Sequence, residues 1–537
     1  MSEIPIKTTT KHELEQVLEN KAPPRRFSEK QPRLQRYLPT LNIGVSWTSN
    51  IILVIGSFVV TPAILHALGD RQYGVWLLVL SFIGQMRVLD MGMSSGCMRY
   101  SAAYYESGDQ ARLTQVFHTS VAIFGGSTVL ALAATAFLAL LLPWLYPAAM
   151  SGMAGVIMLL GGGLALDLCG RPYAASLRGR SMFFVYDGIE AVTYMIFKLA
   201  LVLYLAHIGM SVWNLSLVTF AESVVRNGTV LVFSLKLCPW LTTPKPWLAS
   251  KKMAFNLATY SSAVFLISLA DVIRFQINAG IIAYNAPDSP EQISIFGIGV
   301  RLLVLMCSTI GVVWSVFIPR FSGLSEAGKT EELWALFRKA NRWTGLLSVF
   351  GMVNLAVFGL PFLRLWIGKP WVGESYAVML LAVPGYFVAL LAGPSGGLLS
   401  GLGRMKGQMI VTVLEAICNI SLSFLLVPHL GIFGVCLGMT IPMLLFRSLG
   451  LALVMRRDAK LPLTSYWGMH APILLLGLIY AGLSCGFAFI QYQSFIELFI
   501  GCFMSTLVFV LLSYSTVPEV RQIIGRIWRR RETDPAL

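Results

Sequence analysis

Hydrophobic residues gather in long runs along the whole chain, and short polar segments separate these runs. About 20 consecutive apolar residues cross the hydrocarbon core of a bilayer as an α-helix. Fourteen runs of this kind predict membrane spans at 41–65, 73–96, 115–141, 152–172, 184–206, 212–235, 255–284, 293–318, 339–366, 375–400, 407–428, 431–454, 466–489 and 494–516. The pattern therefore predicts an all-α polytopic membrane protein.

Composition agrees with this prediction. Of the 537 residues, 56% are hydrophobic and only 12% are charged, whereas soluble domains carry about 25% charged residues. The segment 1–40 mixes charges with few large apolar side chains, so we expect a flexible tail there and no cleavable signal peptide.

The basic residues predict how the protein is oriented. If the N-terminus is cytoplasmic, 32 of the 41 lysines and arginines fall in the tails and loops of that side. The opposite side carries only Arg71, Arg364 and Lys369. Because cytoplasmic loops of membrane proteins are enriched in Lys and Arg, both termini are expected in the cytoplasm. The net charge of +15 then reflects membrane orientation, and no nucleic-acid partner is expected.

The loops argue against an enzyme. Every predicted outer loop is about ten residues long or shorter, a length typical of short connections without structure of their own. There is no room for an external catalytic domain. None of the eight cysteines falls in an outer loop, so neither a disulfide framework nor a metal or other cofactor is expected.

Internal similarity predicts two lobes. Glu190 and Glu415 lie 225 positions apart in related segments, and His207 and His429 lie 222 positions apart. Two copies of six spans, both with the same orientation, fit a parallel-repeat transporter. The predicted division is an N-lobe at 41–235, an inter-lobe linker at 236–254, a C-lobe at 255–454, two additional spans within 466–516 and a basic cytoplasmic tail at 517–537. That tail is interpreted either as an amphipathic helix on the membrane surface or as a stop-transfer cap.

The segment "LGDRQYGVWLLVLSFIGQMRVLDMGMSSGCMRYSAAYYESGD" at 68–109 resembles the signature of bacterial polysaccharide transporters, the Wzx-type O-antigen and exopolysaccharide flippases. The later segments "SGLGRMKGQ" and "LLVPHLGIFGVCLG" are similar to the same family. The resemblance implies the fold of the multidrug/oligosaccharidyl-lipid/polysaccharide exporter superfamily, in the bacterial inner membrane. It also implies movement of a polyprenyl-diphosphate-linked oligosaccharide to the outer leaflet, with a polysaccharide polymerase, a co-polymerase and glycosyltransferases as partners.

Charged residues inside the predicted spans are the candidate functional groups, because a charge at the centre of a membrane helix costs about 2.5–3.5 kcal/mol. Three couples have helical spacing and can meet on one face: Arg87 with Asp90, Asp271 with Arg274, and Glu222 with Arg226. Two interpretations stay open for these couples. They stabilise helix packing as ion pairs, or they face a cavity.

Arg274 and Arg301 are the strongest candidates for substrate binding. Their positions along the predicted spans place Arg274 near mid-depth of the membrane and Arg301 in its outer half. No acidic residue nearby on the same span can pair with Arg301. An arginine fork binds phosphate in a bidentate manner. We therefore expect Arg274 and Arg301 to line a cationic cavity that holds the diphosphate, with Arg87 and Lys198 as weaker candidates.

The energy source is open from the sequence. No phosphate-binding loop of the GxxxxGK[ST] type is present, which argues against direct use of ATP. A proton or sodium gradient coupled through Asp271, Glu222 or Asp90 is conceivable, although each has an arginine neighbour. The alternatives to a flippase are a cation-coupled multidrug extruder of the same superfamily and, less favoured, a membrane-embedded glycan polymerase or ligase.

Overall fold

A computed structural model of the chain describes residues 32–241, 245–286, 290–315, 317–516 and 521, and these residues are almost entirely helical. Thirteen of the described helices are long and apolar enough to cross a membrane. Each coincides with one of the predicted spans, and α11 (Lys251–Asn285) covers the fourteenth. The prediction of an all-α polytopic membrane protein is confirmed.

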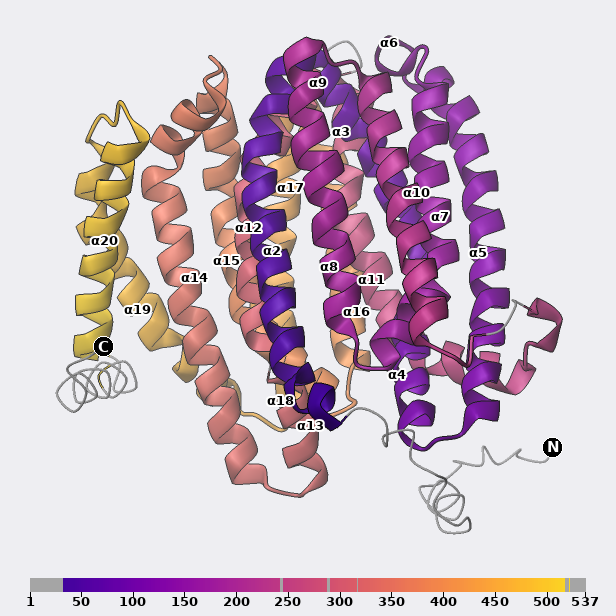
Figure 1. The fold of residues 1–537 in the computed structure, drawn as a ribbon. Coiled ribbons are helices and arrows are strands. Elements are labelled where there is room, and N and C mark those ends of the chain that lie inside the picture. The colour runs from indigo at the N-terminus through magenta and orange to yellow at the C-terminus, as the bar shows by residue number, and fades with distance from the viewer. Residues whose placement is uncertain (1–31, 242–244, 287–289, 316, 517–520, 522–537) are drawn as a thin grey trace, which may run out of the picture.

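The first half of the chain forms the bundle drawn in indigo to magenta in Figure 1. Its elements are α2 (Pro32–Leu68), α3 (Asp70–Gln85), the 3₁₀ segment η2 (Met86–Asp90), α4 (Met93–Glu106), α5 (Gln110–Leu145), α6 (Pro147–Met150), α7 (Ala154–Gly179), α8 (Phe183–Thr193), the π-helical segment η3 (Tyr194–Leu201), α9 (Val202–Ile208) and α10 (Val212–Leu237). Helix α2 begins at Pro32, so residues 32–40 are helical and only 1–31 of the expected tail lie outside the described residues.

The second half occupies the other side of the molecule (Figure 1). After the short η4 (Pro246–Leu248) and α11, it comprises α12 (Glu291–Ser315), α13 (Ile318–Glu326), α14 (Thr330–Ile367), α15 (Val372–Gly401), α16 (Lys406–Leu430), α17 (Ile432–Leu445), the π-helical segment η5 (Phe446–Gly450), α18 (Leu451–Asp458), α19 (Leu463–Ala488) and α20 (Phe495–Thr516). The basic segment that follows lies, apart from Arg521, outside the described residues.

The helices pack mostly within their own half. Helix α7 packs against α4, α5 and α10, whereas α15 packs against α12, α14 and α17. The two halves meet mainly where α3 of the first half contacts α11 and α12 of the second. The expected N-lobe and C-lobe coincide in position with these two halves. That the lobes are separate domains stays a prediction.

The second predicted span is a broken helix. Helix α3 continues into the 3₁₀ turn η2, and then Met91 and Gly92 adopt left-handed conformations with φ of 51° and 67° before α4 begins. Asp90 stabilises the new start, because its carboxylate accepts hydrogen bonds from the Ser94 backbone N–H at 3.1 Å and from the Ser94 hydroxyl at 2.8 Å. The sequence Asp90-Met91-Gly92 suits this break, since glycine adopts the left-handed conformation without strain.

The linker after α10 is attached to the first half. Cys238, Trp240 and Leu241 are buried against α5 and its neighbours. The backbone N–H of Lys245 donates to His118 Nδ1 at 3.3 Å, and that of Ser250 donates to Thr119 Oγ1 at 3.2 Å. The linker therefore begins as part of the first bundle.

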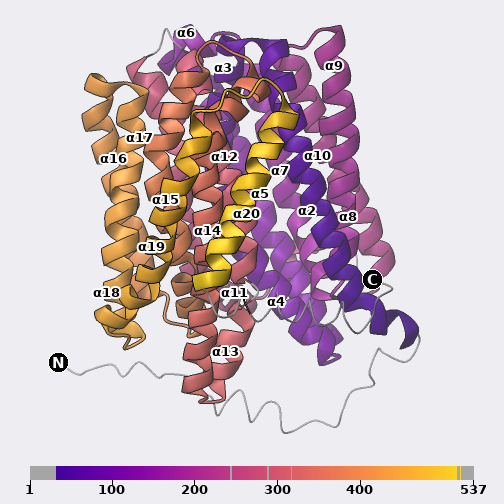
Figure 2. The same ribbon diagram turned by 90° about the vertical axis from the view of Figure 1, so that its left-hand side faces the viewer.

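The two additional helices α19 and α20 pack on α14 at the edge of the second half (Figure 2). A buried polar cluster joins them, since Tyr480 accepts a hydrogen bond from Asn354 Nδ2 at 2.8 Å and lies 2.6 Å from Ser505 Oγ. Polar contacts of this kind hold helices together in a bilayer, where burial of apolar surface gives little driving force.

One end of the molecule, predicted to face outward, is closed where the halves meet. Asp70 at the start of α3 pairs with Lys369 at 2.8 Å and accepts a hydrogen bond from Trp371 Nε1 at 2.8 Å. Ser294 of α12 donates to the Asp70 carbonyl at 2.6 Å. Gly74 lies so close to the Pro290 carbonyl that a Cβ there would be 1.9 Å from its oxygen. We call this set of contacts the outer closure.

Candidate functional site

A cavity of about 280 Å³ lies beside the break in the second span. Its walls come from η2 and the start of α4, from α7 of the same half, and from α11 of the second half through Phe265 and Val272. Four charged side chains line it: Arg87, Asp90, Asp167 and Arg171. Charged groups from two elements, η2 and α7, therefore surround one space that α11 of the second half also lines.

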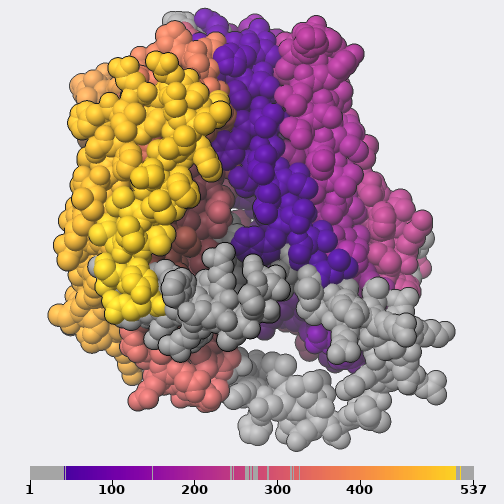
Figure 3. All heavy atoms as spheres, turned by 60° about the vertical axis from the view of Figure 1, so that its left-hand side comes forward, coloured from indigo at the N-terminus to yellow at the C-terminus, as the bar shows by residue number. Residues whose placement is uncertain are grey.

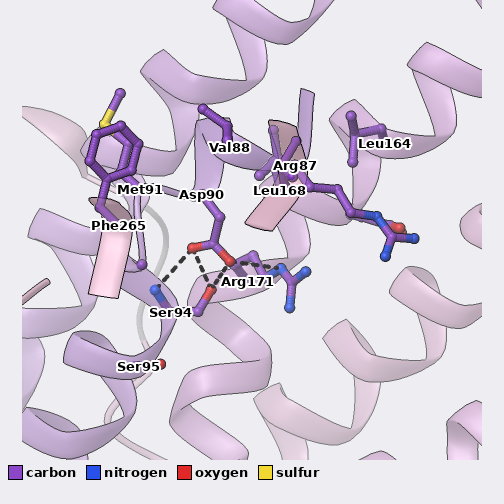
Figure 4. Close-up of a pocket in the computed structure, with 13 residues that line it drawn as sticks. Arg87, Val88, Asp90, Met91, Ser94, Ser95, Leu164, Leu168, Arg171 and Phe265 are labelled. Carbon is purple, nitrogen blue, oxygen red and sulfur yellow. Dashed lines mark hydrogen bonds and ion pairs between the residues drawn. The ribbon is translucent and has the colours of Figure 1, made fainter. Parts of the chain in front are cut away.

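Arg87 and Asp90 line the same cavity but do not pair. Asp90 is bound by Ser94 and lies 3.9 Å from Arg171 Nε of α7. Arg87 is exposed and forms no ion pair with a described residue. Figure 4 shows its side chain extending away from Asp90. The expected Arg87/Asp90 pair is therefore wrong, because capping of α4 turns Asp90 toward the break.

Arg171 is the functional candidate that sequence reasoning missed. Its position at the end of the predicted span 152–172 places it among the cytoplasmic basic residues that indicate orientation. Its spacing of four residues from Asp167 in a predicted span was the available signal. Its side chain is 34% exposed, and its Nε is buried without a hydrogen-bond partner in the described part of the chain.

A second charged cluster fills the interior of the first bundle, between α7, η3 and α10. Glu222 lies between Lys198 Nζ at 3.5 Å and Arg226 at 3.8 Å, and Arg226 also binds Asp167 at 2.6 Å. Lys198 lies in the π-helical η3 and also donates to Thr219 Oγ1 at 2.6 Å. The predicted Glu222/Arg226 pair is confirmed.

These contacts change the expected role of Lys198. It was expected as a weaker ligand of a diphosphate, and the structure instead surrounds it with acceptors of its own half. Its role in substrate binding stays a prediction without geometric support. Because Glu222 is compensated from both sides, it also offers no vacant carboxylate to a coupling ion.

Arg301 faces the first half from the second. It is half-buried on α12, forms no ion pair with a described residue, and interacts electrostatically with the hydroxyls of Tyr73 on α3 and Tyr194 in η3. Among the residues that the structure describes, no carboxylate pairs with this arginine. The backbones of Asp271 and Arg274 lie in α11, and their side chains fall outside the described residues.

The second half contains one ion pair that spacing alone did not predict. Arg447 of η5 binds Glu415 of α16 at 2.6 Å, and Glu415 is fully buried. Glu190, the repeat counterpart of Glu415, interacts electrostatically with Arg226 in the first half. Each half joins its fifth and sixth spans through an ion pair, Lys198–Glu222 in the first half and Glu415–Arg447 in the second.

Residues 67–375 match the sequence model of a family described as "Polysaccharide biosynthesis protein". This match covers more than half of the 537 residues. The chain belongs to this polysaccharide biosynthesis protein family. The resemblance identified from the segment 68–109 is confirmed.

Among relatives of this polysaccharide biosynthesis protein is an "Uncharacterized membrane protein EpsK" of Bacillus subtilis (strain 168), which is 24% identical over 414 residues. The aligned region covers 76% of this chain and 81% of the relative. Solved structures share the fold. The "Lipid II flippase MurJ, inward closed conformation" matches with a TM-score of 0.65 and 12% identity, over 90% of this chain and all of that one.

A second solved structure is an inward-facing "multidrug resistance MATE family transporter of the MOP superfamily". It matches with a TM-score of 0.62 and 13% identity, over 78% of this chain and 98% of its own. At these identities the two structures establish the fold of the polysaccharide biosynthesis protein and not its substrate. The fold is that of multi-pass membrane transporters.

Proposed function

We propose that this protein is a flippase that carries a polyprenyl-diphosphate-linked oligosaccharide from the inner to the outer leaflet of the bacterial inner membrane. The observation that carries the proposal is the position of Arg87 and Arg301. Both lie where the halves face each other, and neither pairs with a carboxylate of the described residues. Membership in the polysaccharide biosynthesis protein family supports a glycan as the cargo.

The arginines supply what a diphosphate loses on leaving water. An arginine within a membrane protein faces water, a partner or an anionic ligand, and its planar fork fits phosphate oxygens. Arg87 and Arg171 line the cavity beside the broken span, and Arg301 lies nearer the outer closure. A diphosphate that moves between the halves would therefore meet guanidinium groups at two depths.

Closure at one end supports alternating access. The outer closure holds α3 against the second half through Asp70, Lys369 and Trp371. A substrate in this state would reach Arg87 and Arg171 from the predicted cytoplasmic side. Release to the other leaflet requires these contacts to separate while the inner ends of the helices approach. Gly74 lies in the outer closure itself, where its lack of a side chain allows the close approach to Pro290.

The alternative of a cation-coupled drug extruder is supported only by the shared fold of the MATE transporter. Such a protein needs carboxylates that exchange a cation. Asp90 and Glu222 are instead held by Ser94, Arg171, Lys198 and Arg226. Neither the family match nor the short outer loops support a polymerase or ligase. The protein is therefore proposed to act as a transporter that passes its cargo to a polymerase and co-polymerase.

The test is the sidedness of lipid-linked glycans in a strain that lacks the gene, compared with the same strain carrying the intact gene. We expect polyprenyl-diphosphate glycans to accumulate in the inner leaflet and surface polysaccharide to disappear. Isolation of the accumulated lipid then identifies the glycan. Unchanged lipid-linked glycans with altered sensitivity to cationic drugs would contradict the proposal and move the protein to the extruder class.

A further inference from the structure

A pocket of about 880 Å³ opens in the second half, between the first turns of α14 and the segment that joins α18 to α19. Trp334, Ala335 and Arg338 of α14 line it, together with Leu461 of the joining segment and Met469 of α19. The α14 residues precede the predicted span of this helix, so the pocket lies at the end predicted to be cytoplasmic. We call it the α14 pocket.

The start of α14 repeats the start of α5 in the first half. Gly108 and Gly328, 220 positions apart, precede the two helices with φ of 71° and 68°. Phe117 and Phe337, again 220 positions apart, are both buried. The two helix starts are therefore equivalent surfaces, and what covers one of them indicates what the other can bind.

The linker covers this surface in the first half. The backbone N–H of Lys245 donates to His118 Nδ1 at 3.3 Å, and η4 packs against α5. In the second half, Arg338 stands 220 positions after His118 and lines the open pocket. The chain there leaves α18 and enters α19 at Leu463, so no segment among the described residues takes the place of η4.

The last helix points toward this uncovered surface. The ring of Phe495, at the start of α20, lies 6.4 Å from that of Phe362 on α14, and the ring of Phe509 lies 5.2 Å from that of Phe350. Because later residues of α20 meet earlier residues of α14, α20 runs along α14 toward the start of that helix. Figure 2 and Figure 3 show the yellow α20 ending above the salmon-coloured cytoplasmic end of the second half.

Segment 517–537 is long enough to reach the α14 pocket. At about 1.5 Å per residue, Arg338 lies about 18 Å beyond Phe350 along α14, and Thr516 lies about 10 Å beyond Phe509 along α20. About 8 Å along the helix axes then separates the end of α20 from the pocket. Even a helical segment covers this distance with about six residues.

The composition of this segment suits the α14 pocket. Arg521 still contacts the end of α20, and beyond it the apolar residues from Ile523 to Trp528 recur at helical spacing among arginines. Trp334 offers an apolar contact in the pocket, and the exposed Glu331 forms no ion pair with a described residue. An arginine binds such a carboxylate through two parallel hydrogen bonds.

The remaining charges also favour this segment. Arg338 and Lys460 line the pocket, and Glu532 and Asp534 follow the arginines of the segment, so each side carries both signs. Residues 1–31 are less suited as the occupant, because they join the start of α2, which packs against α8 of the first half.

We propose that the α14 pocket binds the chain's own segment 517–537, with Trp528 among the apolar side chains and an arginine on Glu331. The segment covers the start of α14 as η4 covers the start of α5, so that both halves are held at their cytoplasmic ends. Binding of this kind goes beyond lipid transport and does not depend on the identity of the cargo.

Cysteine cross-linking in the full-length protein tests this contact. The eight native cysteines are replaced by serine, and Ala335→Cys is combined with Ile527→Cys. A short bismaleimide then joins cysteines that lie close together, in vesicles of phosphatidylethanolamine and phosphatidylglycerol. Gln115→Cys with Ile527→Cys is the matched control, because Gln115 is exposed on α5 at the position that corresponds to the exposed Ala335.

We expect the cross-link from position 335 to form within one chain, at severalfold higher yield than the cross-link from position 115, as read by mass spectrometry of the joined peptides. Adding Trp528→Ala should lower the yield severalfold, whereas Trp528→Phe should retain most of it, because the aromatic ring is the apolar anchor. Both changes lie beyond α20, so the described helices keep their packing contacts.

Equal yields from the two positions, or a yield that Trp528→Ala leaves unchanged, would overturn the proposal. So would a cross-link that forms only between a tagged and an untagged copy, which would make a second copy the occupant. Joining of Ala335→Cys to Phe27→Cys in place of Ile527→Cys would assign the pocket to residues 1–31. A cross-link present in detergent but lost in the vesicles would place the segment on the membrane surface and would also contradict the proposal.

Discussion

For charged side chains, spacing along one helix predicted only some of the contacts that the structure shows. Glu222 and Arg226 meet as their spacing predicts, yet Arg226 is bound more closely by Asp167 of another helix. Asp90 turns to the backbone of its own broken helix and to Arg171. Partners three or four residues apart can meet, but the shorter contact across helices prevails when burial brings a second helix closer.

Arg301 is expected to be needed for transport. Arg301→Ala should lower the flipping rate by about tenfold or more, because a charge-assisted contact to phosphate is worth about 1.5–3 kcal/mol. Arg301→Lys should retain part of the rate. The measurement is sidedness of the lipid-linked glycan in vesicles that contain equal amounts of each variant. Arg112→Ala, at an exposed arginine paired with Asp109, is the control. Full flipping by Arg301→Ala would remove Arg301 from the site.

The Glu415–Arg447 pair is expected to stabilise the second half. Glu415→Ala leaves Arg447 without its bound carboxylate in the protein interior, and breaking a buried pair costs about 3–5 kcal/mol. Replacement of both residues, as Glu415→Leu with Arg447→Met, should recover most of this loss. Thermal unfolding in detergent measures the effect. Equal stability of Glu415→Ala and the wild type would show that the pair contributes nothing.

At the scale of elements, hydrophobic run length located the helices, but irregular backbone within them was not foreseen. The stretch 73–96 was expected as one span, and it contains a 3₁₀ turn and two left-handed residues. The π-helical segments η3 and η5 each carry a paired cation, Lys198 and Arg447. π-helical turns are frequent at functional positions, and no hydropathy pattern predicts them.

The linker is expected to protect Cys238 from alkylation. Burial raises the pKa of the Cys238 thiol to about 12. A thiol in an unfolded chain ionises near pH 8.5, so little thiolate exists at pH 8 in the folded protein. Maleimide labelling of Cys238 should be slow at pH 8 and rise as the pH approaches 12. Because the unfolded thiol ionises first, the stability linked to this group falls as the pH rises above about 9.

Loosening the linker should expose this cysteine. His118→Ala removes the acceptor of the Lys245 N–H, and we expect faster labelling of Cys238 at pH 8. His207→Ala, at an exposed histidine of α9, is the control. Labelling is read by mass spectrometry of the 238 peptide. Identical rates in the two variants would mean that His118 does not hold the linker.

For the whole molecule, the outer closure is the feature that defines the state of the transporter. Its contacts join residues about 300 positions apart, such as Asp70 with Trp371. Trp366 adds a hydrogen bond of 2.7 Å from its indole N–H to the Phe58 carbonyl. These aromatic residues could be placed near a membrane interface from sequence, but their partners in the other half could not.

Reversal of one charge should open the outer closure. Asp70→Lys places two cations together, and the double change Asp70→Lys with Lys369→Asp restores attraction. The readout is labelling of Leu77→Cys by a membrane-impermeant maleimide, in a chain whose eight native cysteines are replaced by serine. Leu77 lies at the contact with Gly297. We expect severalfold faster labelling in the single variant and a return toward the starting rate in the double variant.

Charge reversal at the exposed Asp109–Arg112 pair should leave the labelling unchanged, which controls for altered surface charge. If Asp70→Lys labels no faster than the starting protein, the Asp70–Lys369 pair does not hold the closed state.

By itself, the sequence determined the membrane class, the number and approximate limits of the spans, the family and the candidate arginines. Hydrophobic run length and residue identity are local properties, so one chain suffices to read them. Only the tertiary structure decided which acid pairs with which base, that Arg171 and Arg87 line one cavity, and that Asp70 meets Lys369 and Trp371 in the outer closure. Those features depend on side chains from helices far apart in sequence, whose approach is set by the packing of the whole bundle.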